Sequence, residues 1–147
     1  MFYKRRDYTR VANGRNPIVA HEYLGDSVEG KTVFIADDII ASGESMLEVA
    51  SNLKARGAKR IIADATFPLF TSGLDKFDKA VEEGTLDYVV GTNLTYRKPE
   101  LLNRDWYVDV DVSKYAAYFI VALNHDMSVS SIIDPIKKIE ALLASRK

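Results

Sequence analysis

The chain has 147 residues, 47% of them hydrophobic and 28% charged, and a formal net charge of −1. This composition is that of an ordinary globular protein, and the near-neutral charge excludes a whole-molecule attraction to nucleic acid or membrane. The lack of cysteine excludes disulfides and a cysteine nucleophile, and no apolar run is long enough to cross a bilayer. We therefore expect a single domain, residues 1–147, in the cytoplasm, without a nucleic-acid or membrane partner.

The first 17 residues combine five basic side chains with the turn-forming pairs Asn13-Gly14 and Asn16-Pro17. Because no hydrophobic period runs through them, residues 1–17 are predicted to be a mobile arm in front of a core of residues 18–147. Residues 18–24 are a short strand candidate.

A compact apolar run at residues 32–36 is typical of a strand that is buried on both faces of a parallel sheet. The acidic pair Asp37-Asp38 and a loop of small residues follow this run. Apolar residues at helical spacing from Met46 to Leu53 then predict a helix, with Ser45 and Glu48 as its capping box.

Strands and helices continue to alternate through the rest of the chain. This alternation predicts an α/β fold with a parallel sheet. The expected strands are residues 60–66, 86–91 and 106–110, and the expected helices are residues 74–84, 115–123 and 132–143.

The loop after the acidic pair is the best candidate for a binding site. Ligands of open α/β sheets bind at the carboxyl ends of strands. The first turn of the following helix offers unpaired N–H groups and the positive end of the helix dipole, which suit a phosphate monoester. Ala41, Ser42 and Gly43 allow a ligand to approach the backbone, and the hydroxyls of Ser42 and Ser45 add hydrogen-bond donors.

Asp37 and Asp38 are placed to accept hydrogen bonds from sugar hydroxyls, or to hold Mg²⁺ through oxygen ligands. An acidic pair at a strand end also occurs in receiver domains and in loops that only cap a helix. The pattern alone therefore leaves both readings open.

The stretch from Val33 to Ser45 resembles the phosphoribosyl pyrophosphate motif of type I phosphoribosyltransferases and of ribose-phosphate pyrophosphokinases (phosphoribosyl pyrophosphate synthetases). Similarity to the pyrophosphokinases spans nearly the whole chain, including residues 28–32, 57–60, 65–68, Thr92-Asn93 and Val129-Ser130. The resemblance implies a type I phosphoribosyltransferase-like, Rossmann-like domain from the C-terminal part of such an enzyme. It implies that Asp37 and Asp38 meet the ribose hydroxyls and that the following loop cradles the 5-phosphate, through Ala41, Ser42, Gly43, Glu44 and Ser45.

Tyr3-Lys4-Arg5-Arg6 resembles the Lys-x-Arg segment of the synthetase's catalytic loop. The resemblance implies that Lys4 and Arg6 are catalytic: they close over the phosphates of ATP and, together with Mg²⁺, stabilise the charge of pyrophosphoryl transfer. The alternative is a solvated basic terminus.

Two positions depart from the family's pattern. Ala41 stands where the family usually has Asp, which removes a carboxylate that normally faces the sugar. Glu44 stands where Gly is common and adds negative charge near the phosphate, unless its side chain points to solvent. Because of these departures, the alternative that the chain is a non-catalytic binding or regulatory subunit with a degenerate loop remains open.

In the family, the adenine-binding residues lie in an N-terminal half that has no counterpart in front of Met1. We therefore expect a domain that lacks its first strand–helix unit and binds ribose phosphate without turnover. The exposed sheet is expected to be covered in a homo-oligomer. The implied partners are ribose 5-phosphate, phosphoribosyl pyrophosphate and ATP with Mg²⁺; a phosphoribosyltransferase that uses a nucleobase is the alternative enzyme.

Overall fold

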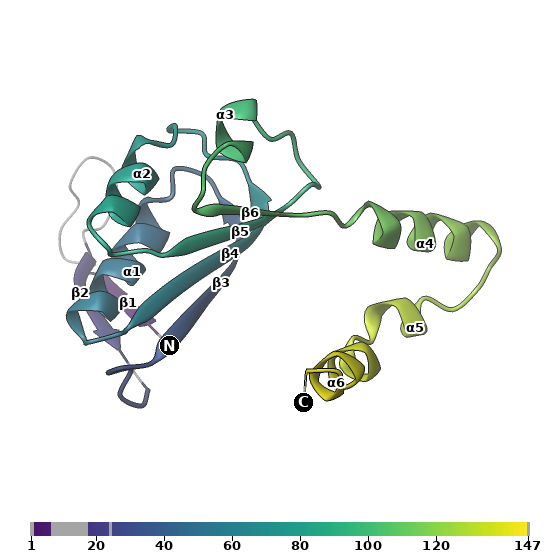
Figure 1. Ribbon diagram of the computed structural model, residues 1–147, viewed down its shortest axis with the longest axis horizontal. Helices are drawn as coiled ribbons and strands as arrows, with labels where there is room; N and C mark the ends of the chain where they lie inside the picture. Colours follow the sequence, from purple (N-terminus) through teal and green to yellow (C-terminus); the bar gives the residue numbers. More distant parts are fainter. Residues whose placement is uncertain (1, 7–17, 24, 147) are drawn as a thin grey trace.

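The computed structural model describes residues 2–6, 18–23 and 25–146 (Figure 1). Strand β1 (Phe2–Arg6) pairs antiparallel with β2 (Ile18–Tyr23), so that Phe2 lies opposite Tyr23. The strand expected over residues 18–24 is thus confirmed. The prediction of an arm is wrong for residues 2–6, which form a strand. Pairing with β2 supplies backbone hydrogen bonds that the local sequence does not indicate. Residues 7–17 of that predicted arm lie outside the described residues.

Four parallel strands form the main sheet, in the order β3-β4-β5-β6. They are β3 (Thr32–Ile40), β4 (Arg60–Pro68), β5 (Tyr88–Thr92) and β6 (Tyr107–Val110). The connections carry the helices α1 (Glu44–Ala55), α2 (Asp75–Glu82) and α3 (Pro99–Leu102). This arrangement confirms the predicted α/β class.

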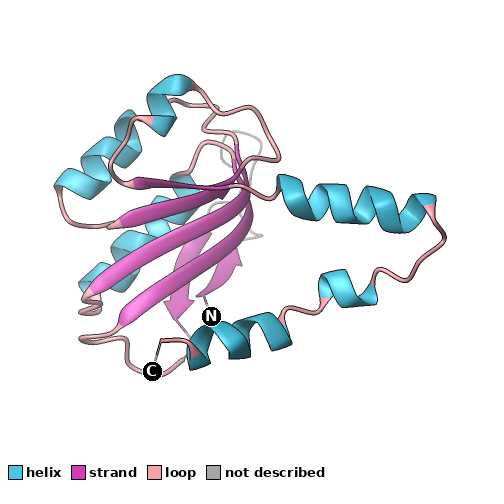
Figure 2. Cartoon of the chain, turned by 45° about the vertical axis from the view of Figure 1, so that its right-hand side comes forward, coloured by secondary structure: helices cyan, strands magenta, loops and turns pink. Residues whose placement is uncertain are grey.

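The core lies between one face of this sheet and the helices α1 and α2 (Figure 2). Alternate residues of β4, Ile61, Ala63 and Ala65, are buried there, and they pack with Phe77 of α2. The residues between them face the other side and are less buried. Burial of the run 32–36 on both faces is therefore a wrong prediction, since Phe34 remains 59% exposed.

Three helices follow β6 and form an arm beyond the sheet (Figure 1). They are α4 (Ser113–Asn124), α5 (Ser130–Ile133) and α6 (Ile136–Ala144). The single helix expected over residues 132–143 is divided, because Pro135 forces Asp134 into an extended conformation (ψ 107°). None of the described helices is long and apolar enough to cross a membrane.

Candidate functional site

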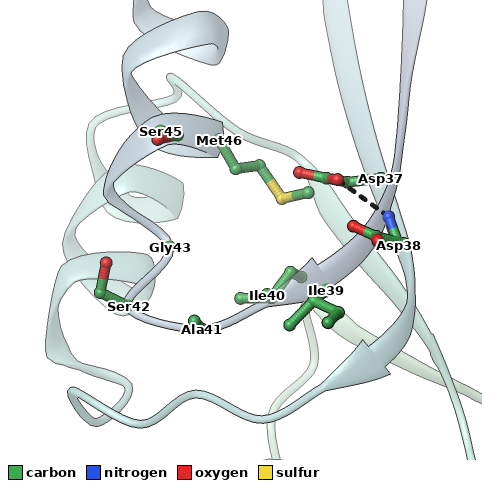
Figure 3. Close-up of a pocket in the computed structure, with 9 residues that line it drawn as sticks. All are labelled: Asp37, Asp38, Ile39, Ile40, Ala41, Ser42, Gly43, Ser45 and Met46. Carbon is green, nitrogen blue, oxygen red and sulfur yellow. Dashed lines mark hydrogen bonds between the residues drawn. The ribbon is translucent and has the colours of Figure 1, made fainter.

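The acidic pair lies within β3, near its carboxyl end. The strand continues past Asp37 and Asp38 to Ile40, which pairs with Pro68 of β4. The backbone N–H of Asp38 donates a hydrogen bond of 2.8 Å to Oδ1 of Asp37 (Figure 3). This bond fixes the direction of the Asp37 carboxylate while both residues stay exposed to solvent.

The carboxyl end of β3, the following loop and the first turn of α1 enclose a cavity of about 260 Å³. Ser42 and Ser45 lie on the opposite side of this cavity from Asp37 and Asp38, and Met46 extends across it toward Asp37 (Figure 3). The structure thus brings together all of the sequence-predicted ribose-phosphate residues except Glu44. The cavity is lined by Asp37, Asp38, Ile39, Ile40, Ala41, Ser42, Gly43, Ser45 and Met46.

The connection between β4 and α2 forms hydrogen bonds with the backbone of this loop. Phe70 N–H donates to the carbonyl of Ile40 at 3.1 Å, and Thr71 N–H donates to the carbonyl of Ala41 at 2.9 Å. These bonds tie the two connections together at the carboxyl edge of the sheet. The loop is therefore a preformed element rather than a loose link.

Gly43 is required at its position for two reasons. Its φ of 77° lies in the left-handed region, and a Cβ atom there would overlap the ring of Phe77. The sequence suggested that Gly43 lets a ligand approach the backbone. In the structure, the stronger reason for glycine at this position is that Phe77 of α2 lies directly against the loop.

Helix α1 begins at Glu44, with Gly43 as its N-cap and no side-chain cap. The predicted capping box of Ser45 and Glu48 is therefore wrong, because Ser45 already lies inside the helix. The first helical bond runs from Leu47 N–H to Gly43 O at 3.0 Å, so the hydrogen-bond ladder of the helix begins at Leu47. Ahead of this ladder, Glu44 N–H makes only a long 3.5 Å contact with Ser42 Oγ. The helix start thus presents donors and its positive end beside the cavity.

The side chain of Glu44 turns away from the cavity. Its Oε1 accepts a hydrogen bond of 2.5 Å from Nζ of Lys76, at the start of α2. This bond and the charge of Lys76 hold the pKa of Glu44 below its usual value. Lys76 was missed in the sequence, although it follows β4, whose carboxyl end lies next to that of β3.

The acidic pair alone offers few ligands for a metal ion. Among the described residues, no group of three or more His, Cys, Asp or Glu side chains could hold a metal. Two adjacent carboxylates fit Mg²⁺ only where substrate oxygens and water complete its shell. Lys4 and Arg6 belong to β1, and their side chains lie outside the described part of the structure.

Comparison with known proteins gives several related sequences. The ribose-phosphate pyrophosphokinase of Shewanella oneidensis is 30% identical over 129 residues, which cover 88% of this chain and 38% of that protein. The ribose-phosphate pyrophosphokinase of Vibrio cholerae is 30% identical over 131 residues, covering 89% of this chain and 38% of that protein. A shorter match, 41% identical over 64 residues, is to the orotate phosphoribosyltransferase of Oceanobacillus iheyensis; it covers 44% of this chain and 30% of that protein.

The crystal structure of phosphoribosylpyrophosphate synthetase from Mycobacterium smegmatis shares the fold, with a TM-score of 0.62 at 23% identity. The alignment covers 73% of this chain and 34% of the synthetase chain. The chain spans 38% of the length of the pyrophosphokinases that it matches. The family model described as "Phosphoribosyl transferase domain" matches residues 1–116, and the chain therefore belongs to the phosphoribosyltransferase domain family.

Proposed function

We propose that this chain binds ribose 5-phosphate in the cavity between β3 and α1, as the C-terminal part of an enzyme that makes phosphoribosyl pyrophosphate. One observation carries the proposal: the cavity has two carboxylates on one side and the start of a helix, with two hydroxyls, on the other. The ribose-phosphate pyrophosphokinases among the relatives support this choice of substrate.

Each side of the cavity suits one part of the ligand. Carboxylates are acceptors, so Asp37 and Asp38 match the hydroxyl donors of the ribose. The donors of the helix start and of Ser42 match a phosphate ester, whose charge is favoured at the positive end of α1. The 5-phosphate and the sugar hydroxyls of one molecule would thus be held at opposite sides of the cavity.

In the complete enzyme, the oxygen of the anomeric hydroxyl attacks the β-phosphorus of ATP. The bond from that phosphorus to the oxygen shared with the α-phosphorus breaks, AMP leaves, and the hydroxyl proton passes to solvent. Mg²⁺ bound with ATP would neutralise phosphate charge in this step, and Lys4 and Arg6 are proposed to add to that stabilisation. The chain alone is expected to bind ribose 5-phosphate without turnover.

Titration calorimetry with ribose 5-phosphate, ribose and inorganic phosphate in the presence of Mg²⁺ tests this function. We expect ribose 5-phosphate to bind more tightly than either fragment. Replacing both acids, Asp37→Asn with Asp38→Asn, should weaken ribose 5-phosphate binding and leave phosphate binding unchanged or stronger. Asp105→Asn, in the loop before β6, is the matched control. Equal affinity of the double variant and the wild type would refute the sugar-binding role, and robust AMP release from ATP would refute the lack of turnover.

A phosphoribosyltransferase that combines phosphoribosyl pyrophosphate with a nucleobase is the second candidate. The match to orotate phosphoribosyltransferase favours it, but that match covers only 44% of the chain. Calorimetry with nucleobases in the presence of phosphoribosyl pyrophosphate separates the two enzymes, since only the transferase requires a base pocket.

A non-catalytic binding subunit is the third candidate, because Ala41 lines the cavity where a carboxylate would face the sugar. If the loop is degenerate, Ala41→Asp should strengthen ribose 5-phosphate binding by roughly tenfold or more, the effect of one hydrogen bond to a charged group. An unchanged affinity would show that the departure at this position is incidental.

A further inference from the structure

The cavity between β3 and α1 has a polar rim and an apolar floor. Asp37, Asp38 and Ser45 line it and are exposed to solvent. Ile40 and Met46 also line it, but they are only 1% and 4% exposed and belong to the hydrophobic core. We call these two side chains the apolar floor. A bound sugar can therefore satisfy its hydroxyls at the rim but not at the floor.

The apolar floor offers a hydroxyl group no strong hydrogen-bond partner. The carbonyl of Ile40 already accepts the N–H groups of Leu69 and Phe70, at 2.9 and 3.1 Å, from the connection after β4. Met46 belongs to the first turn of α1, and the only polar atom of its side chain is a thioether sulfur, which accepts hydrogen bonds weakly and donates none. A sugar hydroxyl directed at the floor would lose its hydrogen bonds to water without replacement.

Met46 lies across the cavity from the acidic pair. Its side chain extends from the helix start toward Asp37, so a sugar bound to the carboxylates lies between them and Met46 (Figure 3). In ribose, the 2- and 3-hydroxyls project from the same face of the ring, and the opposite face has only C–H bonds at these carbons. Both hydroxyls can therefore donate to Asp37 and Asp38 while the C–H bonds contact Met46.

We infer that the apolar floor, chiefly through Met46, makes the site specific for sugars whose 2- and 3-hydroxyls lie on one face of the ring. This inference rests on the proposed binding of ribose 5-phosphate and adds the side chain that selects the stereochemistry of the sugar.

Two analogues separate the floor from the carboxylates. In arabinose 5-phosphate the 2-hydroxyl projects from the other face of the ring, so it leaves the carboxylates and meets the floor. In 2-deoxyribose 5-phosphate the same carbon has no hydroxyl, so the bond to a carboxylate is lost but nothing polar meets the floor. The affinity should therefore fall from ribose 5-phosphate to the deoxy sugar, and fall again to arabinose 5-phosphate.

Titration calorimetry of the wild type with the three sugar phosphates is the first test and requires no variant. We expect ribose 5-phosphate to bind about tenfold more tightly than 2-deoxyribose 5-phosphate, the effect of one hydrogen bond to a carboxylate. Arabinose 5-phosphate should bind about tenfold more weakly still, the cost of a buried hydroxyl without a partner. Equal affinities for the two analogues would overturn the role of the floor and leave the proposed function intact. A lack of ribose 5-phosphate binding would instead refute the proposed function on which the inference rests.

Met46→Gln tests whether this side chain carries the selectivity. Glutamine has nearly the length of methionine and offers an amide to the inverted hydroxyl, so the ratio of the affinities for the two analogues should shrink by about fivefold. Met46→Leu keeps the floor apolar and should retain the wild-type ratio. Met127→Gln, at a methionine 61% exposed between α4 and α5, is the matched control and should change none of the three affinities.

Urea unfolding shows which of these variants are folded. A folded Met46→Gln variant that keeps the wild-type ratio would overturn the assignment to Met46. If that variant fails to fold, the three affinities of the wild type still decide whether the floor rejects the inverted hydroxyl.

Discussion

Lys76, near the start of α2, donates a 2.5 Å hydrogen bond to Glu44, the first residue of α1. The pair joins the connections that follow β3 and β4, which are neighbours in the sheet. Glu44 stands beside the proposed phosphate position, and without a cation its charge would repel the phosphate. Lys76 balances that charge and draws the carboxylate away from the cavity.

We therefore predict that Lys76→Met weakens ribose 5-phosphate binding by about two- to fivefold at low salt, because it leaves the Glu44 charge unbalanced. Calorimetry at low and high salt measures this effect, which should shrink as salt screens the charge. Lys79→Met is the control, since Lys79 pairs with Glu83 on the exposed side of α2. Identical affinities of Lys76→Met and wild type at low salt would show that Glu44 does not act on the phosphate.

The main elements could be predicted from sequence because their signals are local. The apolar runs that became β3, β4, β5 and β6 have the length and composition of parallel strands, and α1, α2 and α4 follow helical spacing. The break before α6 was also readable, since Pro135 disfavours a helical Asp134. It was missed because the apolar residues on both sides keep one helical period.

The features that sequence could not give depend on contacts between distant residues. Glu44 and Lys76 are 32 positions apart, and only the parallel pairing of β3 with β4 brings their helices together. The overlap of Gly43 with Phe77 has the same origin. The exposure of Phe34 follows from which face the helices cover, which a run of apolar residues does not encode. The acidic pair and its loop were found because they are contiguous in the chain.

Gly43→Ala should lower the free energy of unfolding by about 2–4 kcal/mol, from the left-handed backbone and the overlap with the Phe77 ring. Urea unfolding measures the change. Gly30→Ala is a matched control: its φ is also positive, 69°, but nothing lies within 4 Å of the added Cβ, so only the backbone cost of about 1–2 kcal/mol remains. In the double variant with Phe77→Leu, part of the Gly43→Ala loss should return. An equal loss of unfolding free energy in Gly43→Ala and Gly30→Ala would mean that the Phe77 ring moves aside at no cost.

Asp78 on α2 accepts hydrogen bonds from Arg104 Nε and Nη2, at 2.9 and 2.8 Å, and from Trp106 Nε1 at 2.8 Å. Desolvation acts to raise the pKa of Asp78, but the bonds from Arg104 and Trp106 outweigh it and the pKa lies below its usual value. A carboxyl whose pKa is lower in the folded protein than in the unfolded chain stabilises the fold at pH values above its unfolded pKa, near 4. That stability is lost as the pH falls through the pKa of the folded protein.

Asp78→Asn should therefore cost about 1 kcal/mol at pH 7, allowing for the partial exposure of the pair. The difference from wild type should shrink below pH 4, where the wild-type carboxyl becomes protonated. Urea unfolding from pH 3 to pH 7 follows this, with Glu82→Gln on the exposed side of the same helix as the control. A difference that stays constant over this range would assign the loss to packing rather than to charge.

The hydroxyl of Tyr107 is buried against Gly91 and Pro68, with no hydrogen-bond partner among the described residues. Burial, and then the nearby charge of Asp109, raise the pKa of Tyr107 to about 12. Because a buried hydroxyl without a partner costs free energy, Tyr107→Phe should leave stability at pH 7 unchanged or raise it by up to about 1 kcal/mol.

The same shift predicts how the two proteins diverge in alkali. The raised pKa contributes stability that is complete below the unfolded value of 10.0 and is lost as pH rises toward the folded value. By pH 11 the wild type should have lost about 1 kcal/mol that Tyr107→Phe does not lose, because only the unfolded wild type ionises there. Urea unfolding at pH 7, 9 and 11 measures the divergence, and Tyr96→Phe, at an exposed ring, should instead follow the wild type. Parallel losses in wild type and Tyr107→Phe would show that the phenol ionises as easily in the folded protein as in the unfolded chain.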